Sequence, residues 1–270
     1  MANENNIRDT AEAVKGIVEA VPVYQDVVQP AAKEVGTALE TVAKTIHIAL
    51  APISALVWGY DQVKEFVSTK VAEKLTGVPD EKIQTPDPTI AGPTLESLKY
   101  TGHKEDLRDL YANLLANAIH VDEAKNAHPG FVDIIKNLTT DEAKIMKFLA
   151  KRTSYPIISC RANLKKGGGV NILKNISLLG KDSGCEHSNF TPNYIANLCR
   201  LGLIRIPPLS HLTDDNLYAS IINHPTVQAK KREVESQKEV FTGFEIEKNY
   251  IELTEFGLQF ARACIYPPKK

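Results

Sequence analysis

Apolar residues recur every three or four positions between residues 26 and 75, which is the period of an amphipathic helix with one buried stripe. Pro52 is expected to end or kink this helix, and Gly77-Val78-Pro79 to end the run that follows it. The pattern therefore predicts a long helical hairpin or one kinked helix. Its apolar positions are Val28, Ala32, Val35, Leu39, Val42, Ile46, Ala49, Ile53, Leu56, Tyr60, Val63, Val67, Val71 and Leu75.

The next segment, residues 76–93, contains six prolines and glycines and predicts an extended connector. Helical periodicity resumes over residues 94–100 and 104–120, and again after Pro129. Thr139-x-x-Glu142 has the spacing of a capping box, which satisfies the free N–H groups at the start of a helix. These patterns predict a mainly helical first half.

The pattern changes after Lys151, where short strand-like runs alternate with helices and glycine-rich turns. The expected elements are a strand at 155–159, a loop at 165–169, a helix at 191–201 ended by Gly202, a strand at 203–206, a helix at 225–238, a strand at 244–253 and a last helix at 254–265. This order is typical of a winged-helix-like unit enlarged by an insertion.

The expected fold class is mainly α with a small α+β part. An N-terminal helical bundle is followed by an enlarged winged-helix-like C-terminal unit. The expected organisation is a polar N-terminal segment at 1–21, a helical domain at 22–138 and a winged-helix-like α+β domain with insertions at 139–270.

Composition and charge refine this picture. A hydrophobic content of 43% and a charged content of 24% exclude disorder as a description of the whole chain. The net charge of -1 conceals an asymmetry: residues 1–138 hold 13 Lys and Arg against 20 Asp and Glu, whereas residues 139–270 hold 19 against 13. The basic second half permits an anionic partner, and the alternative is that the two halves attract each other.

Nucleic-acid binding is one hypothesis for the basic half, because phosphate contacts require clustered Lys and Arg. The candidate recognition helix at 191–201 carries only Arg200, so a protein-interaction role is favoured. The candidate contacts to nucleic acid or another anionic partner are Lys165, Lys166, Arg200, Lys230, Lys231 and Arg232.

Residues 45–60 contain no charged side chain if His47 is neutral. The run is shorter than the roughly 20 apolar residues of a membrane-spanning helix. A buried core helix is therefore expected, and conditional membrane insertion is the alternative, because Trp58 and Tyr60 suit a bilayer interface. The candidate membrane or partner residues are Ile46, Leu50, Pro52, Leu56, Trp58 and Tyr60.

Motifs for enzyme or metal chemistry are incomplete. Cys185, His187 and Cys199 lack the paired spacings that fix four zinc ligands. The group formed by His120, His128 and the Asp122-Glu123 pair has no pattern that specifies convergence in space. We therefore expect no catalytic residue, no metal and no cofactor.

The start of the sequence suggests a location. Residues 1–20 lack a basic start followed by an apolar block, so a secretory signal is not expected. The four cysteines form no C-x-x-C pair, and free thiols in a reducing compartment are expected. The protein is expected to be cytoplasmic and to contact a membrane only on activation.

Proline- and glycine-containing motifs are spread along the chain in a consistent order. They are Tyr24-Gln25-Asp26-Val27-Val28-Gln29-Pro30-Ala31-Ala32-Lys33-Glu34-Val35-Gly36, Leu50-Ala51-Pro52, Trp58-Gly59-Tyr60, Thr85-Pro86-Asp87-Pro88, Ala91-Gly92-Pro93, Leu114-Leu115-Ala116, His128-Pro129-Gly130-Phe131, Leu201-Gly202-Leu203-Ile204 and Leu253-Thr254-x-Phe256-Gly257. These motifs resemble those of the bacterial abortive-infection alpha (Abi-alpha) family. The resemblance implies a role in phage defence, in which an infected cell stops growing or dies before phage are released.

The resemblance supplies no catalytic residue, and its motif residues are those expected at helix ends, close contacts and connectors. The favoured hypothesis is a non-enzymatic defence protein that binds a protein partner, for example a phage component. One alternative is a membrane-perturbing effector that uses residues 45–60. Another is a nucleic-acid-binding regulator that uses the basic C-terminal half.

Overall fold

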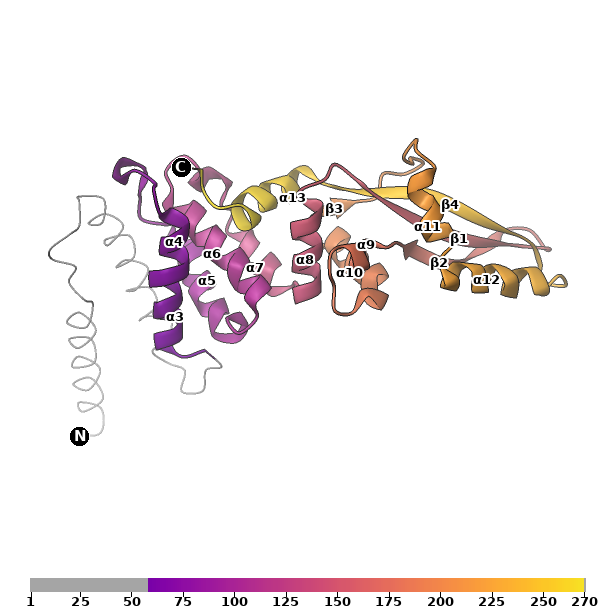
Figure 1. Cartoon of the computed structure of the whole chain (residues 1–270), viewed down its shortest axis with the longest axis horizontal. Coiled ribbons are helices and arrows are strands. Elements are labelled where there is room, and N and C mark those ends of the chain that lie inside the picture. The colour runs from indigo at the N-terminus through magenta and orange to yellow at the C-terminus, as the bar shows by residue number, and fades with distance from the viewer. Residues whose placement is uncertain (1–57, 270) are drawn as a thin grey trace, which may run out of the picture.

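The computed structural model describes residues 58–269, which form an elongated molecule with helices at one end and a sheet-bearing arm at the other (Figure 1). The predicted segment 1–21 and most of the predicted hairpin lie outside the described residues. The helical end consists of α3 (Tyr60–Phe66), the π-helix η1 (Val67–Val71), α4 (Ala72–Leu75), η2 (Asp80–Lys82), α5 (Pro88–Thr101), α6 (Glu105–Ile119), η3 (Ala124–Asn126), α7 (Gly130–Lys136), α8 (Thr140–Leu149), α13 (Glu255–Phe260) and the π-helix η5 (Ala261–Ile265).

Helix α6 is the centre of this end. It packs against α4, α5, α7 and α8, and against both π-helices. Leu107, Leu110, Leu114, Leu115 and Ile119 are all buried, together with the alanines between them. A helix that is apolar on nearly every side belongs in a core, so the other helices assemble around α6.

Two asparagines of α6 hold the end of the chain. The Asn113 side-chain amide donates to the carbonyls of Cys264 and Ile265 at 3.0 and 2.9 Å. The Asn117 amide donates to the carbonyls of Ala263 and Tyr266 at 3.0 and 2.9 Å. Because the last carbonyls of a helix lack intrahelical partners, these bonds stabilise the end of η5 against α6.

The helix boundaries both confirm and correct the sequence predictions. The capping box is present: the Thr139 hydroxyl accepts from the Glu142 N–H at 3.2 Å, and the Glu142 carboxylate accepts from the Thr139 N–H at 2.7 Å. The prediction of an extended connector through residue 93 was wrong, because α5 begins at Pro88. Asp87 caps this helix by accepting from the Thr89 N–H at 2.8 Å, and proline is well suited to a first helical position.

The arm is an antiparallel sheet in the order β2-β1-β4-β3, and two helices lie along it (Figure 1). Its elements, with the helices at its base, are β1 (Tyr155–Leu164), β2 (Gly169–Ile176), α9 (Leu179–Asp182), η4 (Ser188–Phe190), α10 (Thr191–Arg200), β3 (Ile204–Arg205), α11 (Asn216–Ile222), α12 (Pro225–Ser236) and β4 (Phe241–Leu253).

The two faces of this sheet differ in character. Ile158 and Cys160 of β1 form a small buried core with Tyr218 of α11 and Val227 of α12. The alternate positions of the central strands are polar, and the register places Ser159 opposite Glu247 and Arg161 opposite Glu245. Because side chains alternate between the faces of a strand, one face is covered by α11 and α12 and the other is polar.

The fold is mainly α with a small α+β part, as the sequence predicts. The finer predictions of a helical bundle and a winged helix are not confirmed. One continuous hydrophobic core runs from Val63 to Cys264 in sequence and includes Leu107 and Ile157, so it contains residues from both sides of Leu138.

Candidate functional site

The two C-terminal motifs that contain Gly202 and Gly257 meet where β3 pairs with β4. Ile204 pairs with Leu253, and the Thr254 hydroxyl donates to the Gly202 carbonyl at 2.5 Å and accepts from the Gly257 N–H at 2.9 Å. A Cβ added at Gly257 would lie 1.9 Å from the Leu203 carbonyl oxygen. Glycine therefore allows α13 to pack directly against the backbone that precedes β3.

A second motif packs against the first. The ring of Phe256 lies 5.8 Å from that of His128 and 5.1 Å from that of Phe131, while Phe131 lies 5.3 Å from Phe260. His128 Nδ1 accepts the Gly130 N–H at 3.0 Å. Such aromatic pairs stabilise packing, so these motif residues join α7 to α13.

The buried carboxylate of Asp141 holds α8 against the segment before α10. Its oxygens accept the N–H groups of Glu186 and His187 at 2.8 and 2.9 Å and the Tyr194 hydroxyl at 3.1 Å. Burial raises the pKa of Asp141, but these bonds and nearby Lys144 favour the charged form, and the pKa lies below its ordinary value. Asp141 is thus a charged structural anchor.

The polar residues considered for acid–base chemistry have separate partners. The Asp122 N–H donates to His120 Nδ1 at 3.2 Å, and the Asp122 carboxylate pairs with Lys82 at 3.0 Å. Glu123 accepts a hydrogen bond from Asn126 at 2.9 Å, and His128 belongs to the aromatic cluster. These contacts fix a connecting loop, and none aligns an acid with a base.

All four cysteines are free thiols. Burial raises the pKa of Cys160 to about 11 and also raises the pKa values of Cys185, Cys199 and Cys264. Nucleophilic and metal-binding cysteines act as thiolates, which a raised pKa disfavours. Within residues 58–269, no group of three or more His, Cys, Asp or Glu side chains could hold a metal ion.

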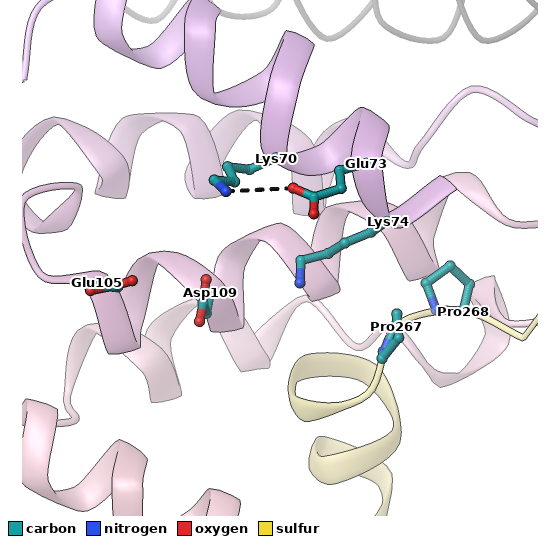
Figure 2. A pocket seen from close by; sticks show the side chains of 7 residues that line it. All are labelled: Lys70, Glu73, Lys74, Glu105, Asp109, Pro267 and Pro268. Carbon is teal, nitrogen blue, oxygen red and sulfur yellow. Dashed lines mark hydrogen bonds and ion pairs between the residues drawn. The ribbon is translucent and has the colours of Figure 1, made fainter. Parts of the chain in front are cut away.

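A cavity of about 450 Å³ opens between α4, α6 and the end of the chain (Figure 2). Lys70 pairs with Glu73 at 3.4 Å on one side, and Asp109 on α6 pairs with Lys147 at 3.6 Å. The cavity carries both signs of charge without a convergent set of polar groups, so its chemistry selects no ligand class. Its lining residues are Lys70, Glu73, Lys74, Glu105, Asp109, Pro267 and Pro268.

Two turns meet at the far end of the arm, which we call the arm tip and define as residues 164–170 and 237–241. The Lys165 N–H donates to the Val240 carbonyl at 3.0 Å and joins the turns. The Lys165 ammonium lies 3.7 Å from the carboxylate of Glu239, whose side chain is 97% exposed. Such an exposed pair contributes little, so the ammonium remains available to a partner.

The other predicted basic contacts do not all join the arm tip. On α12, Lys230 pairs with Glu233 at 2.7 Å and Lys231 with Glu235 at 3.9 Å. Arg200 belongs to α10 at the base of the arm, where its guanidinium donates to Asn197 Oδ1 at 2.9 and 2.7 Å. Lys166 and Arg232 are exposed, and Lys166 lies in the arm tip beside Lys165.

The predicted membrane segment is described only at its end. Ile46, Leu50, Pro52 and Leu56 lie outside the described residues. Trp58 and Tyr60 are half-buried and pack against the helical core. Over residues 58–269, every helix is too short or too polar to cross a bilayer.

The sequence profile of a known family, described as abortive infection alpha, matches residues 59–264. The chain belongs to this family. Among curated proteins, none matches this chain. One solved structure, an uncharacterized protein from the hydrocarbon-degrading marine bacterium Alcanivorax borkumensis SK2, is similar at 16% identity and a TM-score of 0.35, over 48% of this chain and 87% of that chain.

In this abortive infection alpha protein, three residues of the arm tip were not predicted as candidate contacts from the sequence. Lys238 follows α12, and Val170 and Val240 are 42% and 47% exposed beside the lysine turn. The Lys-Lys-Gly-Gly-Gly sequence at 165–169 predicts the first turn of the arm tip. No local pattern predicts that residues 237–241 lie beside it, because this proximity depends on the register of β1 with β4.

Proposed function

We propose that the protein acts in abortive infection by binding another macromolecule, without catalysing a reaction. The observation that carries this proposal is the family match over residues 59–264. The name of the family suggests that an infected bacterial cell is arrested or killed before phage are released. We infer that the protein acts in the cytoplasm on a protein partner, for example a phage component.

The arrangement of the polar residues supports binding rather than chemistry. The thiols have raised pKa values, and Asp141 uses its carboxylate to anchor backbone N–H groups. The arm extends from the helical end (Figure 1). The sheet face opposite α11 and α12 carries the polar residues Ser159, Glu245 and Glu247, and the two glutamates are exposed. An extended polar surface on a sheet is suited to contacts with a partner.

The two alternative functions receive less support. A membrane-perturbing effector is not favoured, because Trp58 and Tyr60 pack against the helical core and no described helix could span a bilayer. A nucleic-acid-binding regulator requires a basic stripe, and on α12 Glu233 and Glu235 follow the three basic residues and leave the helix a net charge of only +1.

The experiment is phage plating on a bacterial host that carries the gene or an empty vector, across a panel of phages. We expect fewer plaques on the host with the gene for at least one phage. Replacing Cys185 and Cys199 together by serine should preserve the reduction, because the proposal gives these thiols no chemical role. Unreduced plating of every phage despite confirmed expression, or loss of protection in the folded double variant, would contradict the proposal.

A further inference from the structure

Positive charge and exposed apolar side chains occur together at the arm tip. Lys165 and Lys166 lie in the first turn and Lys238 in the second, and the one acidic side chain in either turn is Glu239. Val170 and Val240 are 42% and 47% exposed there. Apolar side chains surrounded by lysines are typical of surfaces that insert into the headgroup region of a bilayer.

The tip has room to approach a flat surface. Gly167 and Gly168 have φ values of 88° and 75°, and a Cβ added to either would meet no atom within 4 Å. The first turn is therefore open on its outer side. The arm also separates the tip from the helical end (Figure 1).

This separation matters for electrostatics. Residues 58–149, which make up most of the helical end, hold 15 Asp and Glu against 11 Lys and Arg and so carry a net charge of -4. An anionic bilayer would repel this end and attract the tip, and both effects decay over about 10 Å in ordinary salt. The arm keeps the repelled end away from a surface that the tip contacts.

We propose that the arm tip docks on an anionic phospholipid bilayer. The lysines would attract lipid phosphates, and Val170 and Val240 would enter the interface. The inference goes beyond the proposed function, because it assigns a docking point and leaves the rest of the molecule free for a partner.

Nucleic acid shares the phosphate chemistry but fits the tip less well. Single strands are bound by stacking bases on exposed aromatic rings, and the one aromatic residue of the tip, Phe241, is half-buried in β4. Duplex binding takes a longer basic stripe, which Glu233 and Glu235 of α12 interrupt. The exposed valines favour lipid.

The test uses the purified full chain and cosedimentation with vesicles of phosphatidylglycerol and phosphatidylcholine, or of phosphatidylcholine alone. Each lysine near an anionic surface strengthens binding about fivefold, so three together account for about 100-fold. We expect binding to the anionic vesicles at low salt and weak binding to the neutral ones. The triple variant Lys165→Gln, Lys166→Gln, Lys238→Gln should lose about 100-fold in partition constant.

A matched control removes the same charge from α12. Lys230→Gln, Lys231→Gln and Arg232→Gln together should lower the partition constant by less than about fivefold, because these residues lie within α12 along the side of the arm (Figure 1), behind the tip, and the attraction to the bilayer decays over about 10 Å. An equal loss in both triple variants would overturn the proposal, since it would show a dependence on net charge alone.

The valines give a second readout. Val170→Thr with Val240→Thr keeps the shape of the side chains and removes apolar surface, so the partition constant should fall about threefold to tenfold. This loss should be the same at low and at high salt. No effect of this double variant would contradict insertion. Failure to bind anionic vesicles at low salt, or tighter binding to duplex DNA in the same buffer, would overturn the proposal and leave the plaque assay unaffected.

Discussion

Replacing Asp141 by asparagine should destabilise the protein strongly at neutral pH. The carboxylate is 3% exposed and accepts hydrogen bonds from two backbone N–H groups and the Tyr194 hydroxyl. An asparagine retains one accepting oxygen and turns an NH₂ group toward donors. Hydrogen bonds to a charged group each contribute about 1.5–3 kcal/mol, so we expect a loss of about 3 kcal/mol in the free energy of unfolding.

The effect should also depend on pH with a defined sign. The pKa of Asp141 in the folded protein lies below its ordinary value. Its contribution is therefore fully present above the unfolded pKa of about 3.9 and is lost as the pH falls toward the folded pKa. The stability difference between wild type and variant should be constant near neutral pH and narrow as the pH falls below about 4.

Urea denaturation at several pH values measures this difference. Asp133→Asn is the matched control, because the Asp133 side chain is 76% exposed and pairs with Lys136 at 3.4 Å on the surface of α7. It should cost under about 0.5 kcal/mol. If Asp141→Asn were as stable as the control, or if its deficit were the same at about pH 3 as at about pH 7, the anchoring role assigned to Asp141 would be refuted.

Three further substitutions test close contacts. Gly257→Ala places a Cβ against the Leu203 carbonyl and should cost about 3 kcal/mol in a urea titration; an unchanged midpoint would contradict the contact. Asn117→Ala removes donors to two carbonyls of the chain end and should cost about 2 kcal/mol, seen as a lower melting temperature by circular dichroism. Gly102→Ala would place a Cβ 2.2 Å from the ring of Trp58, the one tryptophan of the chain, so its fluorescence should shift to longer wavelength, whereas an unchanged spectrum would exclude this packing.

Local patterns predicted the elements whose causes are local. The apolar period identified α6, and the Thr139-x-x-Glu142 spacing identified the start of α8. Gly202, with a φ of 72°, ends α10 as expected of a glycine in the left-handed region. Each signal lies within a few residues of the feature it predicts.

Other features depend on contacts between distant parts of the chain. Strand β2 was not predicted from the sequence. It carries extra residues where it pairs with β1 on either side of Cys160, and these bulges disturb the alternation of apolar and polar residues along β2. The helical start at Pro88 was hidden by prolines that usually interrupt helices. The packing of η5 against α6 depends on hydrogen bonds from the side chains of Asn113 and Asn117. The apolar period along the sequence does not predict such bonds.

The candidate surface was only partly predictable for the same reason. Lys165 and Lys166 were recognised as a basic turn, but Lys238 and Val240 join them only through the pairing of β1 with β4. Arg200 and the α12 lysines were grouped with them by charge. The structure separates Arg200 and provides the α12 lysines with carboxylate partners.

The most direct test of abortive infection follows infected cells at a multiplicity high enough to infect nearly all of them. We predict that cells carrying the gene release few phage and also fail to form colonies, whereas empty-vector cells lyse and release a normal burst. A normal burst from cells that express the protein, or blocked phage with full survival of the infected cells, would contradict the account.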